Sequence, residues 1–399
     1  MQKLIAHRRV KIEGSNKMSE KYLGESIKKL GFGYMRLPRR DGVFDVTAVN
    51  EMVDEFMSHG FSYYDTSIIY EGSEEALHES LVLRYPRESF QIATKISMFG
   101  VNKPEQHYEM LNTSLTRLGV DFVDYYLIHA MGEAAEKMAD THDTWSFMRE
   151  IKEKGLAKHI GFSYHGTPEL LDEILTKHPE MEMVQLQINY LDWENPEVES
   201  RRLYEVARKH NKPISIMEPT KGGLLAGGES AVTDMLKAAN PDVSAASWAF
   251  RYVGELEGLI TVLSGMENID QIKDNARTFE NNTPLTKEEH ALIQKAVEVI
   301  NSTPRIPCTT CRYCAPHCPQ KINIPGFIGI YNTYLVHKQK NSSGYQYAMM
   351  SSFGGSPKNC IKCRICEQHC PQKIEISDVM DKVAEALDDI KENFIIKSE

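Results

Sequence analysis

All eight cysteines of the chain lie in two copies of one seventeen-residue segment near its C-terminal end. The copies are CTTCRYCAPHCPQKINI, from Cys308, and CIKCRICEQHCPQKIEI, from Cys360, and eleven of their seventeen positions are identical. Each copy has the spacing C-x₂-C-x₂-C-x₃-C-P, at which thiolates hold a cubane iron–sulfur cluster. Two copies therefore predict two 4Fe-4S clusters and a chain equipped to carry electrons.

Zinc ions and disulfide bonds are the alternatives for these cysteines. A zinc site takes four ligands, commonly as two separated pairs, whereas each copy here is a tight quartet that closes with Cys-Pro. The x₂ spacings put neighbouring thiols on one tight loop, which favours a metal cluster over disulfides and indicates a reducing cytoplasm. We therefore expect iron–sulfur clusters.

The cysteine pattern resembles that of bacterial two-cluster ferredoxins, in which the fourth cysteine of each run ligates the other cluster. One predicted ligand set is Cys308, Cys311, Cys314 and Cys370. The other predicted set is Cys360, Cys363, Cys366 and Cys318. His317 and His369 occupy the same place in the two copies, and because four thiolates complete each site, we expect these histidines to pack locally or to hydrogen-bond a cluster.

The connection between the two copies is longer than in a compact ferredoxin, with 41 residues between Cys318 and Cys360. It contains IPGFIGIYNTYLVHK, which we predict as a helix over 324–338. Ser342, Ser343 and Gly344 then predict a loop. The tail is therefore expected to be a small, mainly α-helical dicluster domain, joined to the preceding chain by a helix over 284–300.

From about residue 30 to residue 280, short apolar runs alternate with amphipathic segments. In 47–60, Val49, Met52, Val53 and Phe56 have the spacing of a helix with one buried face. Eight β-branched and aromatic runs are predicted strands: 30–35, 61–67, 90–97, 121–130, 157–163, 183–190, 213–219 and 258–265. Eight parallel βα units over about 250 residues predict an α/β protein with a (β/α)8 TIM barrel. An open doubly wound sheet is disfavoured because no G-x-G-x-x-G follows the first strand.

Functional side chains of such a barrel lie at the C-terminal ends of its strands. Asp65 and Tyr70 follow the second predicted strand, Lys95 ends the third and His129 ends the fourth. Four titratable groups on three neighbouring strand ends indicate proton transfer. A lysine beside a tyrosine would lower the phenol pKa from about 10, an aspartate would hold the lysine, and a neutral histidine would donate to a substrate oxygen. Other polar residues at strand ends are Ser163, Gln187, Glu218 and Ser264.

The segment GFSYYDTSIIYEGSEE, from Gly60, resembles the signature of the aldo-keto reductase family. Lys95 in ATK and His129 in YYLIH complete what resembles that family's Asp–Tyr–Lys–His tetrad. LGFGYMRLP, from Leu30, and VLSGM, from Val262, are also similar to family segments, so that the resemblance covers residues 26–282. The cysteine-rich tail fits a branch of the family with a ferredoxin-like extension.

The resemblance implies hydride transfer between a nicotinamide cofactor and the carbonyl carbon of a small carbonyl or alcohol substrate. Tyr70 would protonate the carbonyl oxygen, Lys95 would lower the tyrosine pKa, and Asp65 would orient Lys95. His129 would polarise or orient the substrate. The expected contacts of the cofactor, NADP or NAD, are Gly33, Met35, Ser163, Gln187, Met217, Ser264, Gly265, Gln271 and Asn275.

Within this set, Ser163 and Gln187 match positions that hold the nicotinamide carboxamide. Met217 departs from the family, because an aromatic ring usually stacks on the nicotinamide there, although a thioether can also pack on a ring. The segment with Ser264, Gly265 and Asn275 matches the adenosine end. Candidate walls of the substrate pocket are Met98, Phe99 and Trp193.

A second departure concerns the 2′-phosphate of NADP, which requires a cation where NAD does not. Gly265 and Gln271 stand where the family usually supplies lysine and arginine. Lys221 or Lys273 could substitute. The choice between NADP and NAD therefore stays open.

Composition and length set the domain prediction. The 399 residues carry a formal net charge of −10, without the basic block that would indicate nucleic acid and without an apolar run of membrane-spanning length. The first seventeen residues lack the apolar core of a signal peptide, and we interpret them as a leader, a tag remnant or an upstream start, with Met18 as the alternative initiator. The predicted parts are an N-terminal extension (1–25), the barrel (26–282), a linker helix (283–305) and a ferredoxin-like domain (306–399).

The two halves of the chain indicate different electron chemistry. A hydride carries two electrons, a cubane normally passes one, and flavin is the common group that joins the two, but we see no flavin fingerprint. We expect an oxidoreductase with hydride transfer at the barrel and clusters that exchange electrons with a ferredoxin or flavoprotein partner. The alternatives are a carbonyl reductase with structural or regulatory clusters, and an electron-transfer module whose barrel binds a ligand without hydride chemistry.

Overall fold

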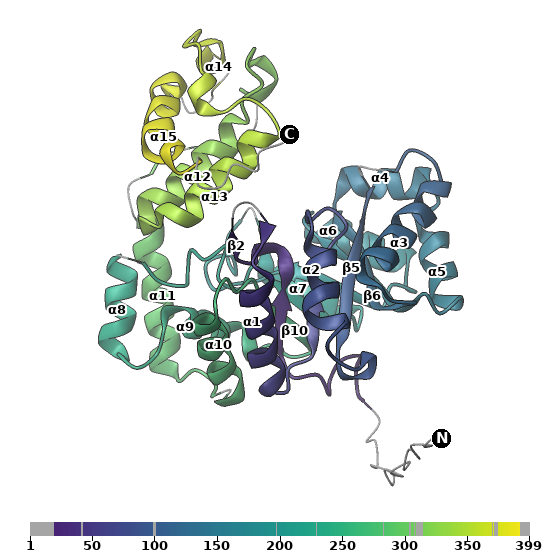
Figure 1. Ribbon diagram of the computed structural model, residues 1–399. Helices are drawn as coiled ribbons and strands as arrows, with labels where there is room; N and C mark the ends of the chain where they lie inside the picture. The colour runs from purple at the N-terminus through teal and green to yellow at the C-terminus, as the bar shows by residue number, and fades with distance from the viewer. Residues whose placement is uncertain are drawn as a thin grey trace, which may run out of the picture.

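Eight parallel strands close into a barrel in the order β1-β10-β9-β8-β7-β6-β5-β4, with β4 paired to β1. The computed structural model describes residues 20–391 except 41–42, 99–100, 197, 229, 282, 303–304, 307, 309–313, 369 and 371–373. The barrel strands are β1 (Leu30–Gly33), β4 (Tyr63–Asp65), β5 (Gln91–Ser97), β6 (Val123–Met131), β7 (Ala157–Tyr164), β8 (Met183–Gln187), β9 (Ile214–Met217) and β10 (Leu259–Ser264). All eight predicted strands are present, and the closed barrel is confirmed over the open sheet (Figure 1).

Helices follow the strands along the chain and surround the barrel. They are α1 (Val46–Ser58), α2 (Ser73–Leu77), α3 (Glu105–Leu118), α4 (Glu133–Thr141), α5 (Thr144–Glu153), α6 (Pro168–Lys177), α7 (Ser200–Lys209), α8 (Ala231–Ala239), α9 (Ala245–Gly254) and α10 (Ile269–Asn281). A short helical turn, η1 (Tyr34–Arg36), follows β1, and β2 (Arg39–Arg40) pairs with β3 (Val43–Phe44). The apolar stripe predicted over 47–60 is the buried face of α1, whose first turn is capped by Asp45.

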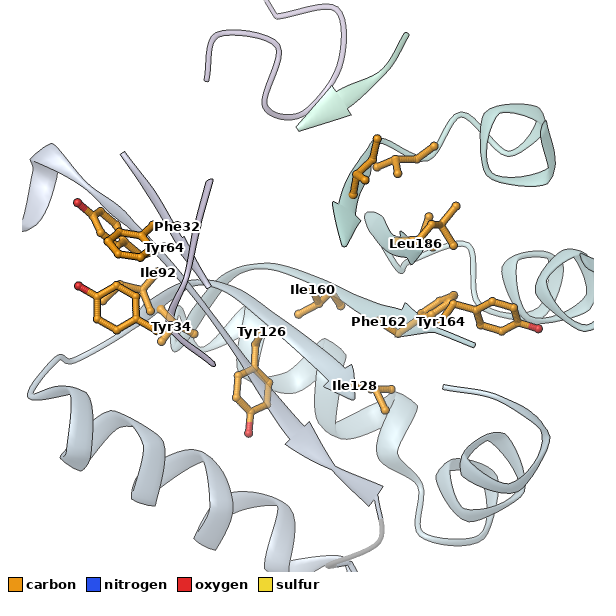
Figure 2. Close-up of a cluster of buried hydrophobic side chains, with 14 of the residues drawn as sticks. Phe32, Tyr34, Tyr64, Ile92, Tyr126, Ile128, Ile160, Phe162, Tyr164 and Leu186 are labelled. Atoms are coloured by element: carbon orange, nitrogen blue, oxygen red, sulfur yellow. The ribbon is translucent and has the colours of Figure 1, made fainter. Parts of the chain in front are cut away.

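The two faces of the barrel strands have different cores. Side chains on the outward face pack against the helices, and Figure 2 shows this layer around Phe32, Tyr64, Ile92 and Phe162. A second buried cluster contains side chains of the alternate positions: Tyr63, Ala93, Tyr125, Leu127, Met183 and Leu263. Because strand side chains alternate between faces, the residues two positions further on continue this inner row. Asp65, Lys95 and His129 are therefore brought to one rim of the barrel.

Among the described residues that follow the barrel, the α-helices are α11 (Lys287–Ser302), α12 (Ile324–His337), α13 (Lys340–Ser352), α14 (Ile365–Gln368) and α15 (Ile376–Lys391). Buried residues of α11 pack with α8 and α9 of the barrel, among them Ile293 and Ala296. The helices α12, α13 and α15 enclose a separate core around Phe327, Tyr347 and Val383 and stand beyond one rim of the barrel (Figure 1). None of the helices in the described part of the chain combines the length and hydrophobicity of a membrane span.

The helices predicted over 284–300 and 324–338 are observed as α11 and α12. The loop predicted at Ser342, Ser343 and Gly344 is wrong, because these residues lie inside α13. Serine and glycine have low helix propensity, but tertiary packing overrides propensity. Ser343 and Gly344 are buried here, where small side chains permit close packing of helices.

Candidate active site

A buried ion pair joins the ends of β4 and β5. The ammonium Nζ of Lys95 donates to Oδ1 of Asp65 at 2.7 Å and to the carbonyl oxygen of Thr66 at 2.7 Å. Lys95 has no exposed surface and Asp65 is 5% exposed. Burial raises the pKa of Asp65 and the charge of Lys95 opposes that rise. Because a buried charge needs a partner, each of these side chains holds the other in place.

Tyr70 and His129 meet beside this ion pair. The tyrosine hydroxyl lies 3.5 Å from Nε2 of His129, with the rings nearly perpendicular at 84°. Nζ of Lys95 lies 5.5 Å from the centre of the Tyr70 ring. The structure thus brings together all four residues of the predicted tetrad, from three neighbouring strands.

Ser67 is part of this arrangement and was not singled out from the sequence. Its hydroxyl lies 3.0 Å from Nδ1 of His129 and accepts a hydrogen bond of 3.5 Å from the backbone N–H of Ile69. A hydroxyl that accepts from Ile69 still has its own proton to donate to Nδ1. When the hydroxyl donates to Nδ1, the proton of a neutral His129 lies on Nε2, which faces Tyr70.

The pKa values of His129 and Tyr70 suit both side chains to act as neutral hydrogen-bond donors. Burial, followed by the positive charge of Lys95, lowers the pKa of His129 to about 3, so this imidazole is neutral near pH 7. Burial, followed by the charge of Asp65, raises the pKa of Tyr70 well above its usual value. Burial thus outweighs the lowering of the Tyr70 pKa that was expected from Lys95, whose ammonium donates its hydrogen bonds to Asp65 and Thr66.

Ser163 supports the end of strand β6. Its hydroxyl accepts a hydrogen bond of 2.8 Å from the backbone N–H of Ala130, which has the left-handed φ of 53°. The register between β6 and β7 shifts between Ile128 and Met131. This bulge directly follows His129, so Ser163 helps to fix the position of the imidazole.

Gln187 belongs to a polar cluster around Asp192, a residue with no exposed surface. The side-chain amides of Gln187 and Asn189 each donate to Oδ2 of Asp192 at 2.8 Å. Lys221 forms an ion pair with Oδ1 of the same carboxylate. The ammonium of Lys221 is thereby neutralised locally, which weakens its candidacy as the partner of a 2′-phosphate.

Gly33, one of the predicted cofactor contacts, lies beside the residues predicted at the adenosine end, where β1 meets β10. A Cβ on Gly33 would lie 3.4 Å from the carbonyl oxygen of Ser264, and a Cβ on Gly265 would lie 3.5 Å from the Arg36 side chain. Asn275, on α10, donates to the Ser264 hydroxyl at 3.0 Å. The two glycines thus leave room along this seam that side chains would fill.

The remaining predicted contacts surround the same rim with varied exposure. Met35 and Met217 are half-buried, and Gln271 is exposed. The side-chain oxygen of Gln271 accepts from the backbone N–H of Glu267 at 2.8 Å. Near the tetrad, Oδ2 of Asp65 is buried without a hydrogen-bond partner. The seam lined by glycine fits a ligand that approaches the backbone closely.

Two of the three candidate pocket walls, Met98 and Trp193, have described contacts with other side chains. Met98 is completely buried among the outer core residues and contacts the Thr144 hydroxyl. The Trp193 ring packs with Tyr204 and Tyr252 on the helical side. The Met98 prediction is therefore wrong, and Phe99 lies outside the described residues.

The cysteine segments form a second candidate site. One cavity is lined by four cysteines from both copies, Cys318, Cys360, Cys363 and Cys366, the same four that were predicted to share a cluster. Lys362 and Arg364, between these cysteines, have the left-handed φ values of 55° and 57°. Left-handed residues between right-handed ones aim successive N–H groups at one point, as at many iron–sulfur sites. The cavity and this backbone fit an anionic cluster.

The other predicted ligand set is only partly placed. Cys308, Cys314 and Cys370 pack on the same core as the first cavity, whereas Cys311 and His369 lie outside the described residues. His317 lines the cavity of the other set. No disulfide bond joins any two of the seven described cysteines.

A model of the aldo/keto reductase family matches residues 29–298. The chain belongs to the aldo/keto reductase family. A 4Fe-4S dicluster domain matches residues 307–375, in the cysteine-rich tail. Both resemblances expected from the sequence are confirmed.

Known relatives cover the barrel part of this aldo/keto reductase. Protein REDOX 2 of Catharanthus roseus is 29% identical over 58% of this chain and 74% of its own length. The uncharacterized oxidoreductase YqkF of Bacillus subtilis is 26% identical over 69% of this chain and 96% of its own. Among solved structures, the holo form of the aldo-keto reductase AKR11C1 from Bacillus halodurans is 27% identical, with a TM-score of 0.56, over 69% of this chain and 95% of its own.

Proposed function

We propose that the barrel transfers hydride between a nicotinamide nucleotide, NADP or NAD, and the carbonyl carbon of a small carbonyl or alcohol substrate. The observation that carries this proposal is the contact of Tyr70 with His129 beside the buried Lys95–Asp65 pair. Membership of the aldo/keto reductase family supports it. The bound nicotinamide supplies the hydride in reduction and accepts it in oxidation.

In the reductive direction Tyr70 is the general acid. Its hydroxyl gives a proton to the carbonyl oxygen as the carbon gains the hydride, and the alcohol is released. The N–H of His129 at Nε2 donates a hydrogen bond to the same oxygen and orients it. The ammonium of Lys95, 5.5 Å from the Tyr70 ring, stabilises the phenolate left behind. Asp65 keeps that ammonium in place.

The test removes only the tyrosine hydroxyl. Tyr70→Phe is expected to lower NADPH- or NADH-dependent reduction of 4-nitrobenzaldehyde at least about a hundredfold, because general acid catalysis contributes that much or more. Tyr108→Phe, on the outer helix α3, is the matched control and should keep wild-type turnover. Equal turnover of Tyr70→Phe and wild type would contradict the proposal.

The nucleotide is proposed to contact Gln187 at its nicotinamide and to contact Gly33, Ser264, Gly265 and Asn275 toward its adenosine end. With Lys221 paired to Asp192, Lys273 on α10 is the remaining candidate cation for a 2′-phosphate. Lys273→Ala should weaken NADPH binding and leave NADH binding unchanged if this lysine selects NADP. Fluorescence titration with both nucleotides distinguishes the two cases.

A second proposed function is that two 4Fe-4S clusters in the tail, held by the two predicted ligand sets, exchange electrons with the barrel or with a ferredoxin or flavoprotein partner. The position of α13 against the barrel rim favours it, because Ser342 of α13 donates to Gly222 of the barrel at 2.6 Å. Thiolate clusters of this kind are expected in a reducing cytoplasm. Anaerobic titration with NADPH and NADH tests it: bleaching of cluster absorbance supports electron exchange, and nucleotide binding without bleaching supports structural clusters.

A further inference from the structure

Helix α13 of the iron–sulfur extension docks on the barrel loop that follows β9. The Ser342 hydroxyl donates to the carbonyl oxygen of Gly222 at 2.6 Å, and the Gln339 amide donates to the carbonyl oxygen of Gly227. Arg36, directly after β1, donates to the same Gly222 carbonyl at 3.0 Å. One backbone carbonyl thus receives hydrogen bonds from the barrel and from the extension.

Tyr345 lies one turn along α13 from this contact and faces the barrel rim. The Arg36 guanidinium lies 5.7 Å from the centre of the Tyr345 ring and 3.7 Å from the Glu218 carboxylate at the end of β9. Asp65, Glu218, Tyr345 and Arg36 are the groups whose charges act on the pKa of Tyr70. The contact with Arg36, which follows β1 and approaches Glu218 after β9, places Tyr345 over the rim where these two strands end.

Two tyrosines of α13, Tyr345 and Tyr347, lie on opposite sides of the helix. Tyr347 is completely buried in the core of the extension, and its hydroxyl donates to Asp388 of α15 at 2.9 Å. A residue two positions earlier is rotated by about 200° around the helix, which puts Tyr345 on the opposite side. The extension uses Tyr347 for its own packing and presents Tyr345 to the barrel.

We propose that Tyr345 is a specificity-determining residue of the carbonyl site, so that the iron–sulfur extension supplies one wall of the barrel's substrate pocket. The inference rests on the proposed function of the barrel. An aromatic ring offers a flat apolar face to a planar substrate, and Arg36 beside it adds a positive charge. The substrate class that this wall favours is an aromatic or conjugated carbonyl compound.

Steady-state kinetics on the full-length protein with intact clusters test the inference. Tyr345→Ala should raise KM for 4-nitrobenzaldehyde about tenfold, with kcat within about threefold of wild type, because one aromatic contact contributes about 1 kcal/mol or somewhat more. KM for propanal, which is too small to reach the ring, should stay unchanged. Tyr345→Phe keeps the ring and should restore the wild-type KM.

The matched control is Tyr331→Ala, which removes a half-buried tyrosine of α12 that packs on the core of the extension. It should leave KM unchanged for both aldehydes. If Tyr345→Ala changed kcat or KM equally for both aldehydes, Tyr345 would have a purely structural role and the inference would be overturned. The same holds if the ratio of KM for 4-nitrobenzaldehyde to KM for propanal stayed at its wild-type value. Absence of wild-type turnover would instead overturn the proposed function on which the inference rests.

Discussion

The side-chain amide of Gln187 donates a hydrogen bond of 2.8 Å to Oδ2 of Asp192, a carboxylate with no exposed surface. Asn189 donates to the same oxygen and Lys221 is paired with the other. Asp192 takes one of the two N–H donors of Gln187 and thereby fixes the amide, and we propose that its carbonyl oxygen is directed to the nucleotide. This orientation suits the N–H₂ group of a nicotinamide carboxamide.

Substitution of Asp192 by asparagine is predicted to weaken nucleotide binding. A neutral amide pairs poorly with Lys221 and brings its own N–H₂ group close to those of Gln187 and Asn189, so the glutamine loses its fixed orientation. We expect the Kd for NADPH or NADH to rise about tenfold, which corresponds to about 1.4 kcal/mol. The measurement is fluorescence titration. Asp172→Asn, which removes a partly exposed carboxylate paired with Lys209, is the control and should leave the Kd unchanged.

The pair of Lys95 and Asp65 is predicted to be coupled in stability as well as in catalysis. Asp65→Asn leaves a buried ammonium without its counter-charge, and such losses cost about 3–5 kcal/mol of unfolding free energy. The double variant Asp65→Asn/Lys95→Met removes both charges and should recover much of that loss. Urea unfolding of the two single variants and the double variant gives the coupling energy. Additive losses would show that the buried pair is not coupled.

An exposed ion pair provides the comparison for this cycle. Lys137 and Glu133 are 2.8 Å apart on α4 with most of their surface in solvent. The same double-mutant cycle on these two residues is expected to give a much smaller coupling energy than the buried pair, because solvent and salt screen exposed pairs. A coupling energy as large as that of the buried pair would contradict the role assigned to burial.

Most of the tetrad could be predicted from the sequence, because strand side chains alternate between two faces and functional residues lie at the C-terminal ends of barrel strands. Ala93 and Leu127 belong to the inner cluster, and Lys95 and His129 follow them by two positions, so all four side chains lie on the inner face. This alternation can be counted from the local sequence alone. Contacts between segments distant in sequence were not predictable in the same way. Tyr345 reaches the rim only through the docking of α13, and local propensity had predicted a loop at Ser342–Gly344 just before it. The pKa of Tyr70 likewise depends on burial, which residue spacing does not reveal.

Acid is predicted to destabilise the protein partly through His129. Its pKa is about 3 in the folded protein, below the usual unfolded value near 6.5, because burial disfavours the imidazolium. As the pH falls from about 6.5 toward 3, the unfolded chain binds a proton that the folded protein does not, so folding free energy is lost. Relative to His129→Gln, wild type should lose roughly 1–2 kcal/mol between pH 7 and pH 5, measured by urea unfolding.

His59 provides a control of opposite sign. Hydrogen bonds to Glu280 and Glu55 raise its pKa in the folded protein. The stabilisation from a raised pKa is complete below the unfolded pKa and disappears as the pH rises through the folded pKa. His59→Gln should therefore be less stable than wild type at pH 5 and approach it at pH 8. The same sign of pH dependence for both histidine variants would contradict the assignments.

Cluster ligation is predicted to cross between the two cysteine segments. Cys318 belongs to the first copy, but it lines one cavity with Cys360, Cys363 and Cys366 of the second. Cys318→Ser and Cys363→Ser should each remove the same cluster, leaving about four of about eight iron atoms per chain. The double variant Cys318→Ser/Cys363→Ser should then retain as much iron as either single variant, because the other cluster keeps all of its ligands.

The informative contrast is the double variant Cys308→Ser/Cys318→Ser, in which both substitutions lie in one copy. Crossed ligation predicts that it loses both clusters, since Cys308 and Cys318 then serve different clusters. If each run bound its own cluster, this variant would keep about four iron atoms and Cys318→Ser/Cys363→Ser would keep none. Iron analysis and electron paramagnetic resonance of the reduced proteins separate the two patterns, because the surviving cluster has its own spectrum.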